Sequence, residues 1–163
     1  MSLQLEPVHK KDKPILHNLY ALFLHDISKY TNNLQINENG FFDYEDIHCF
    51  WDTEGISPYF IKIDQTLIGF LLLVERPFLK KQNDYGINDL FILNQYKGKG
   101  YGRMAVEKLF DEKKGQYFVI QVENNKPAVV FWRKVLQTSS LDLNEEKREI
   151  DGEQCLIQTF TIQ

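Results

Sequence analysis

A glycine-rich run in the second half of the chain limits the possible folds more than any other segment. Gly98, Gly100 and Gly102 lie between a short apolar segment, residues 90–93, and a segment with helical periodicity, residues 104–110. A strand, a tight glycine turn and a helix in this order bring the unpaired N–H groups of a helix N-terminus next to a loop that a ligand can approach closely. Because these groups lie at the positive end of the helix dipole, the run predicts a site for an anion such as a pyrophosphate.

The spacing of the glycines separates three kinds of anion-binding loop. A P-loop requires G-x-x-x-x-G-K followed by Ser or Thr, which the run does not contain. A dinucleotide-binding loop requires G-x-G-x-x-G, and Glu123 does lie roughly 20 residues on, where an acid would bind the ribose. However, the glycines here alternate with single residues, and only about 60 residues follow, too few for the repeated βα units of that fold. The third kind is the loop that binds the pyrophosphate of acyl-CoA.

The glycine run resembles the first signature of the GNAT acetyltransferase superfamily. That signature is an apolar strand and a short turn, followed by Arg/Gln-x-x-Gly-x-Gly/Ala at the start of a long helix. Lys97, Gly100 and Gly102 occupy the three motif positions, with Lys where Arg or Gln is commoner. Tyr96 matches an aromatic residue that often stands just before the motif.

A second segment, farther along the chain, resembles the second signature of the same superfamily. There Asn125 is followed by Ala128 three residues later and by Trp132 four residues after that. The two signatures are separated by residues 116–122, which are typical of one strand. With two motifs in the right order and the right element between them, the chain is identified as a member of the superfamily over roughly residues 58–136.

The remaining segments predict one domain, residues 1–163, of the α/β class (an α+β sandwich). Pro14 suits the first turn of a helix that runs to about Ile27, and Asp151-Gly152 is a strong hairpin turn. The apolar residues of that helix at helical spacing are Ile15, Leu19, Leu22 and Phe23. Together with the resemblance, these patterns predict a mixed, mostly antiparallel central sheet of about seven strands, splayed in a V and flanked by about four helices.

The resemblance implies a site for acetyl-CoA, the cosubstrate, between two splayed strands. The pantetheine arm would pair with the backbone of the first of these strands, at Leu90, Phe91 and Ile92. The pyrophosphate would bind to the loop, whose residues are Lys97, Gly98, Lys99, Gly100, Tyr101, Gly102 and Arg103. Asn125 would orient the arm, although an N-cap of the following helix is the other interpretation of this residue.

Asp89 and Trp132 are the candidate catalytic residues. Asp89 could remove the proton of the attacking ammonium through a water molecule, and the alternative is an acid that faces solvent at a strand edge. Trp132 stands where the family often has a Tyr as the acid for the leaving thiolate, and an indole N–H is far too weak an acid for that role. Either the thiolate leaves unaided, or another group such as Tyr96 or Tyr101 substitutes.

An acidic and aromatic stretch after the first helix predicts where the acceptor binds. Residues 31–54 contain six acidic residues and no Lys or Arg, interleaved with aromatic side chains. This composition suits a cationic amine, and we expect the acceptor pocket at Asp43, Tyr44, Glu45 and Asp46. The alternative is an acidic face in solvent whose aromatic residues belong to the core. No group of His, Cys, Asp and Glu has metal-ligand spacing, so no metal is expected.

The composition does not favour nucleic acid or a membrane as a partner, and two functions are compatible with the sequence. A net charge of −4 does not favour nucleic acid as a partner, and the lack of a long apolar run or signal peptide predicts a cytoplasmic protein without membrane contact. We expect a monomer or homodimer. The first function is an acyl-CoA-dependent N-acetyltransferase that moves an acetyl group from acetyl-CoA to a primary amine, on a small cationic amine or a protein, by direct attack. The second is a non-catalytic acyl-CoA-binding or regulatory module of the same fold.

Overall fold

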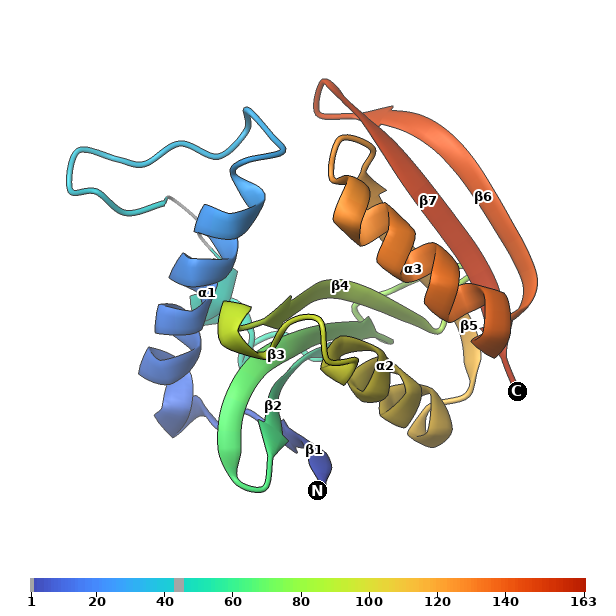
Figure 1. Ribbon diagram of the computed structural model, residues 1–163, viewed down its shortest axis with the longest axis horizontal. Coiled ribbons are helices and arrows are strands. Elements are labelled where there is room, and N and C mark those ends of the chain that lie inside the picture. Colours follow the sequence, from blue (N-terminus) through green and yellow to red (C-terminus); the bar gives the residue numbers. More distant parts are fainter. Residues whose placement is uncertain (1, 43–45) are drawn as a thin grey trace.

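The described strands form one mixed seven-stranded sheet, which confirms the predicted fold class (Figure 1). The computed structural model describes residues 2–42 and 46–163, and of Asp46 only the backbone. Along the sheet the order is β1-β2-β3-β4-β5-β7-β6, and all neighbours are antiparallel except β4 and β5. The strands are β1 (Leu3–Pro7), β2 (Ile56–Ile63), β3 (Thr66–Glu75), β4 (Tyr85–Ile92), β5 (Gly115–Val122), β6 (Leu141–Ile150) and β7 (Glu153–Ile162).

β4 and β5 separate from each other partway along their length. They pair only where Tyr85–Ile87 lie beside Tyr117–Val119, yet β4 continues to Ile92 and β5 to Val122. Beyond the paired half, β4 keeps its hydrogen bonds to β3, and β5 keeps its hydrogen bonds to β7. The sheet therefore opens in the predicted V between these two strands.

The described residues contain three α-helices, whereas about four were expected. They are α1 (Lys13–Ile27), α2 (Tyr101–Glu112) and α3 (Lys126–Ser139). Residues 31–54 were expected to be irregular or to contain a second short helix, and the helical structure among their described residues is the 3₁₀ turn η2 (Asp46–Cys49). Asn37 explains part of this, because its Oδ1 accepts hydrogen bonds from the N–H groups of Asn39 (2.9 Å) and Phe41 (3.1 Å). Such side-chain contacts compete with helical backbone bonds.

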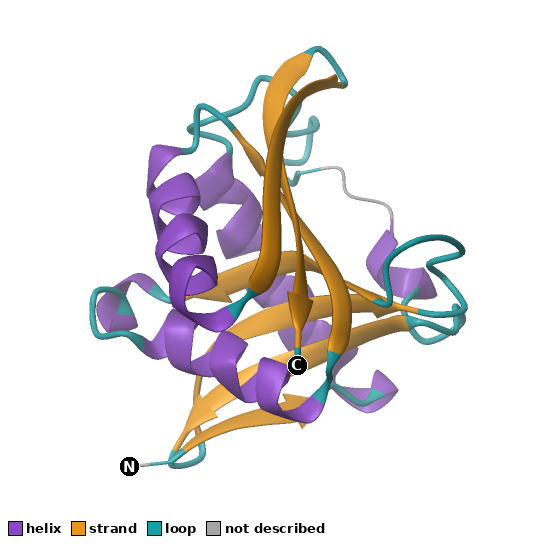
Figure 2. Ribbon diagram, turned by 90° about the vertical axis from the view of Figure 1, so that its right-hand side faces the viewer, coloured by secondary structure: helices purple, strands orange, loops and turns teal. Residues whose placement is uncertain are grey.

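The helices divide between the two faces of the sheet. Residues of α2 and α3 pack with one face in a core cluster that includes Tyr117 and Val119 of β5. Residues of α1 pack with the other face in a second cluster that includes Phe70 and Phe91. The β6–β7 hairpin, turned at Asp151-Gly152 as expected, stands steeply inclined to β1–β4 (Figure 2).

The buried stripe of α1 differs from the one suggested by helical spacing. Its buried residues are Leu16, Leu19, Tyr20 and Leu24. Ile15 and Leu22, which share the same spacing, are 43% and 49% exposed. Two overlapping apolar stripes run along this helix, and periodicity alone does not choose between them. Burial of the stripe that contains Tyr20 brings this residue against the aromatic rings of the sheet, where its ring centroid lies 4.4 Å from that of Phe70.

Candidate active site

The glycine loop is an open cradle at the N-terminus of α2. Gly98 and Gly100 have φ values of 78° and 85°, a backbone conformation that favours glycine. A Cβ atom at either position would meet nothing within 4 Å. Gly100 is the N-cap of α2, so the first N–H groups of the helix have no helical partner and face this open space. The loop therefore leaves open space in front of a helix N-terminus, and pyrophosphate binding there stays a prediction.

Gly102 has a different role from the other two glycines of the loop. It lies within α2, and a Cβ atom there would lie 3.2 Å from Cε1 of Phe131 in α3. The small residue lets the first turn of α2 approach α3 closely at Phe131. Its place in the motif thus reflects packing rather than backbone conformation.

The cationic side chains of the loop are mostly held by other elements. Nζ of Lys97 lies 3.1 Å from Oδ2 of Asp26 in α1. Arg103 donates to Glu107 and to Oγ1 of Thr138, both at 2.6 Å. Lys99 is exposed and forms no ion pair with a described residue. The backbone and Lys99 are therefore the parts of the loop best placed to bind an anion, while Lys97 and Arg103 tie the loop to α1 and α3.

The outer half of β4 presents an unpaired backbone edge to the gap. The N–H of Leu93 donates to the carbonyl of Ile68 at 2.8 Å, so the backbone groups of Leu93 point toward β3. Because backbone groups of successive strand residues point to alternate sides, those of Leu90 and Ile92 point toward the gap left by β5. The side chain of Phe91 is buried against α1 and that of Ile92 against α2. Residues 90–92 lie where an extended arm would add to the sheet.

Asp89 lies at the start of this open half. The register of β4 against β3 skips Asn88, so a bulge separates Ile87 from Asp89. The carboxylate is half-buried, and its Oδ2 accepts a hydrogen bond from the hydroxyl of Tyr20 at 2.7 Å and one from the amide of Asn88 at 3.2 Å. Desolvation by burial raises the pKa of Asp89, and the two hydrogen bonds only partly oppose that rise. A carboxylate with a raised pKa is a better proton acceptor near neutral pH.

Tyr20 is the site residue that the sequence analysis missed. It lies on the buried stripe of α1, 69 positions before Asp89 in the chain. A tyrosine on an apolar stripe is a weak signal by itself, since the hydroxyl of a buried tyrosine needs a partner but the sequence does not say which one.

Trp132 and Asn125 both belong to α3. Trp132 is buried in the cluster that α3 forms with α2 and the sheet, and its ring lies edge-on to that of Phe131 at 5.2 Å. Asn125 is the N-cap of α3, because its Oδ1 accepts a hydrogen bond from the N–H of Ala128 at 3.3 Å. The capping interpretation of Asn125 is thus present in the structure, and a role toward the pantetheine arm stays a prediction.

The predicted acceptor residues lie almost wholly outside the described part of the chain. Asp43, Tyr44 and Glu45 are outside the described residues, and for Asp46 only the backbone, in η2, is described. Their role therefore stays a prediction.

A cavity of about 410 Å³ opens beyond the end of β5. The segment after α1 and the start of β7 meet there, because Oγ1 of Thr31 and the N–H of Asn32 donate to Glu153 at 2.6 and 3.2 Å. Two acids, Glu123 and Glu153, share the wall with one lysine. The lining residues are Tyr30, Asn32, Val122, Glu123, Asn124, Lys126, Glu153 and Gln154.

A splayed strand pair beside a glycine loop at a helix N-terminus defines the class of the protein as an acyl-CoA-dependent acyltransferase. The chain belongs to the acetyltransferase (GNAT) family, whose model matches residues 19–136. The predicted family and the prediction of an N-acetyltransferase are thereby confirmed. No curated protein sequence matches the chain.

Solved structures of other acetyltransferases share the fold. An acetyltransferase from Thermus thermophilus superposes with a TM-score of 0.71 at 19% identity, covering 99% of this chain and 98% of that one. Spermidine N-acetyltransferase from Vibrio cholerae, in complex with CoA and spermine, gives 0.63 at 17%, covering 99% and 95%. The ribosomal-protein-S18-alanine N-acetyltransferase from Escherichia coli gives 0.64 at 14%, covering 99% and 94%. At these identities the likeness shows the fold alone.

None of the helices among the described residues is long and apolar enough to cross a membrane. Within the same residues, no group of three or more His, Cys, Asp and Glu side chains could hold a metal ion.

Proposed function

We propose that the protein transfers the acetyl group of acetyl-CoA to the primary amine of a small cationic acceptor in a ternary complex. The observation that carries the proposal is the open half of β4, which runs from Asp89 to the glycine loop. Three features follow one another along it. They are the N–H groups at the start of α2, the unpaired backbone edge of β4 and the half-buried carboxylate of Asp89. Each of the three matches one part of the acyl transfer.

In this proposal each group along the open half of β4 has one role in binding or in proton transfer. The backbone N–H groups of α2's first turn and Lys99 bind the pyrophosphate, and the backbone of Leu90 and Ile92 pairs with the pantetheine arm. An N–H on this edge stabilises the oxyanion that forms when the amine attacks the thioester carbonyl. Asp89 accepts the proton of the incoming ammonium through water, since only a neutral amine can attack. With Trp132 at the family's tyrosine position, water protonates the departing thiolate.

The cavity beyond β5 supports a cationic amine as the acceptor. It adjoins the end of β5, and its lining includes Glu123, which is paired with Lys147, together with Glu153 and Tyr30. Acids and an aromatic ring together favour an ammonium group. Two of the structural relatives are named as N-acetyltransferases, one of spermidine and one of the alanine of a ribosomal protein. The contribution of residues 43–46 to the acceptor pocket stays a prediction.

The test is a panel of amines assayed for release of free CoA from acetyl-CoA. We expect turnover with small cationic amines and much less with neutral or acidic ones. Asp89→Asn, assayed beside the wild-type protein, controls for uncatalysed thioester hydrolysis. Binding of acetyl-CoA without turnover of any amine would favour the second function, an acyl-CoA-binding module, to which the absence of a tyrosine at position 132 already points.

A further inference from the structure

Gln121 of β5 carries a buried acceptor atom with no partner. Its side chain is only 5% exposed, and its Oε1 is the buried side-chain nitrogen or oxygen that lacks a hydrogen bond among the described residues. Buried polar atoms are nearly always paired, because desolvation without a replacement hydrogen bond is costly. An orphaned acceptor of this kind calls for a donor.

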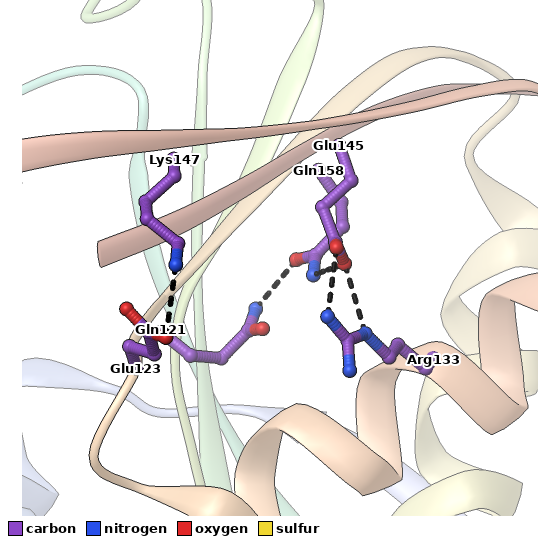
Figure 3. Close-up of polar contacts among 6 residues, drawn as sticks. All are labelled: Gln121, Glu123, Arg133, Glu145, Lys147 and Gln158. Atoms are coloured by element: carbon purple, nitrogen blue, oxygen red, sulfur yellow. Dashed lines mark hydrogen bonds and ion pairs between the residues drawn. The ribbon is translucent and has the colours of Figure 1, made fainter. Parts of the chain in front are cut away.

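The orientation of this amide is fixed by a chain of hydrogen bonds (Figure 3). Arg133 of α3 donates twice to the carboxylate of Glu145, at 3.1 and 2.8 Å. A carboxylate only accepts, so Gln158 must turn its Nε2 to Glu145, at 2.8 Å. That leaves Oε1 of Gln158 to accept from Nε2 of Gln121, also at 2.8 Å. Because Glu145 can only accept, it fixes which end of each amide donates, and the carbonyl oxygen of Gln121 is left without a donor.

The free oxygen belongs to the half of β5 that has separated from β4. Gln121 lies two residues beyond Val119, the last residue of β5 that pairs with β4. Its amide nitrogen donates to Gln158 on β7, so its oxygen is the end of the amide that does not contact that side chain. Side chains alternate along a strand, which puts Gln121 on the same face as Tyr117, whose ring contacts Phe110 of α2. This is the face that α2 and α3 cover.

We propose that Gln121 Oε1 accepts a hydrogen bond from an amide N–H of the pantetheine arm of acyl-CoA. The inference rests on the proposed function, which places that arm between β4 and β5. A neutral amide N–H suits the site better than the ammonium of the acceptor, because a buried ammonium needs a counter-charge and the nearby carboxylate of Glu145 is already held by Arg133 and Gln158. Arg133, Glu145 and Gln158 are then positioning residues that keep the acceptor oxygen in place.

The experiment compares two ligands on Gln121→Met, which keeps the length of the side chain and removes the acceptor. The ligands are CoA and 3′-phospho-ADP, which keeps the pyrophosphate but has no pantetheine arm. We expect CoA to bind about five- to tenfold more weakly to the variant by calorimetry, as for one neutral hydrogen bond, with 3′-phospho-ADP unchanged. Gln116→Met, at an exposed position in the paired half of β5, is the matched control and should change neither affinity.

Three results would overturn the inference. They are equal affinity of Gln121→Met and the wild-type protein for CoA, an equal loss for both ligands, and a change confined to the KM of the amine. A wild-type protein that binds neither ligand would overturn the proposed function and this inference with it. Thermal unfolding without ligand checks that the variant folds. If it does not, Glu145→Gln takes its place with the same expected pattern, because it leaves Gln121 intact while it removes the carboxylate that fixes the polarity of the chain and pairs with Arg133.

Discussion

Gly100→Val separates the conformational role of the glycine loop from its role in binding. Gly100 has a φ of 85°, a conformation that costs an L-residue about 1–2 kcal/mol. A Cβ atom there meets nothing within 4 Å, so the side chain adds no steric clash to the unliganded protein. The free energy of unfolding should therefore fall by about 1–2 kcal/mol, which lowers the Tm of a domain of this size by about 2–8 °C.

The same substitution should have a much larger effect on acetyl-CoA binding. The valine methyl groups would fill the open space in front of the first N–H groups of α2, where the pyrophosphate is proposed to lie. Loss of two charge-assisted hydrogen bonds corresponds to about 3 kcal/mol or more, and thus to a loss of affinity of about 100-fold or more. Calorimetric titration with acetyl-CoA measures this, and a parallel thermal unfolding experiment measures the stability.

Gly152→Val is the matched control for this prediction. Gly152 lies in the turn between β6 and β7, with a φ of 81° and nothing within 4 Å of a Cβ position. It should lose as much stability as Gly100→Val and keep its affinity for acetyl-CoA. If Gly100→Val binds acetyl-CoA as tightly as the control does, the loop is not the pyrophosphate site.

Three further substitutions test the chemistry and the acceptor. Asp89→Asn keeps the shape and removes the base, so kcat should fall strongly near neutral pH and partly recover at high pH, where more amine is neutral. Trp132→Phe should change kcat little, because no proton transfer depends on the indole. If Trp132→Phe abolishes activity and Asp89→Asn leaves kcat unchanged at every pH, the roles of the two residues are the reverse of those proposed. Glu153→Gln should raise the KM of a cationic amine and leave that of acetyl-CoA unchanged, and equal effects on both would remove the cavity beyond β5 from the acceptor site.

The sequence predicts most of the fold because its turns and helix ends are set locally. Pro14 and Pro127 mark the first turns of α1 and α3, and Asp151-Gly152 fixes the register of the last hairpin. The glycine loop is predictable for the same reason, since positive φ and a helix N-terminus are properties of adjacent residues. The splay of β4 from β5 followed from the family resemblance rather than from the residues themselves.

The parts that could not be predicted depend on residues distant in the chain. The hydrogen bond between Tyr20 and Asp89 joins residues 69 positions apart, and its existence depends on which of two apolar stripes of α1 is buried. The free oxygen of Gln121 depends on Gln158, 37 positions away, and through it on Glu145. No periodicity or motif encodes these pairings, because they arise only when separate elements pack.

These distant pairings lie on opposite faces of the sheet, which predicts that the two substrates approach from opposite sides. Asp89 shares its face with Phe91, which packs against α1, whereas Gln121 shares its face with Tyr117, which packs against α2. The thioester would then reach the gap from the α2 face and the amine from the α1 face. Tyr20→Phe removes a hydrogen bond that favours the ionised carboxylate, so the pKa of Asp89 should rise further and the acid limb of the pH–kcat profile should move to higher pH.

The same variant distinguishes the two faces. If the substrates enter from opposite sides, Tyr20→Phe should leave the affinity for CoA unchanged while it shifts the acid limb, and Gln121→Met should weaken CoA binding without moving that limb. A Tyr20→Phe protein that loses affinity for CoA, with its pH profile unmoved, would place both residues on one substrate and contradict the assignment of the two faces. Measuring the pH–kcat profile and the CoA affinity of both variants therefore tests the geometry of the gap independently of the identity of the amine.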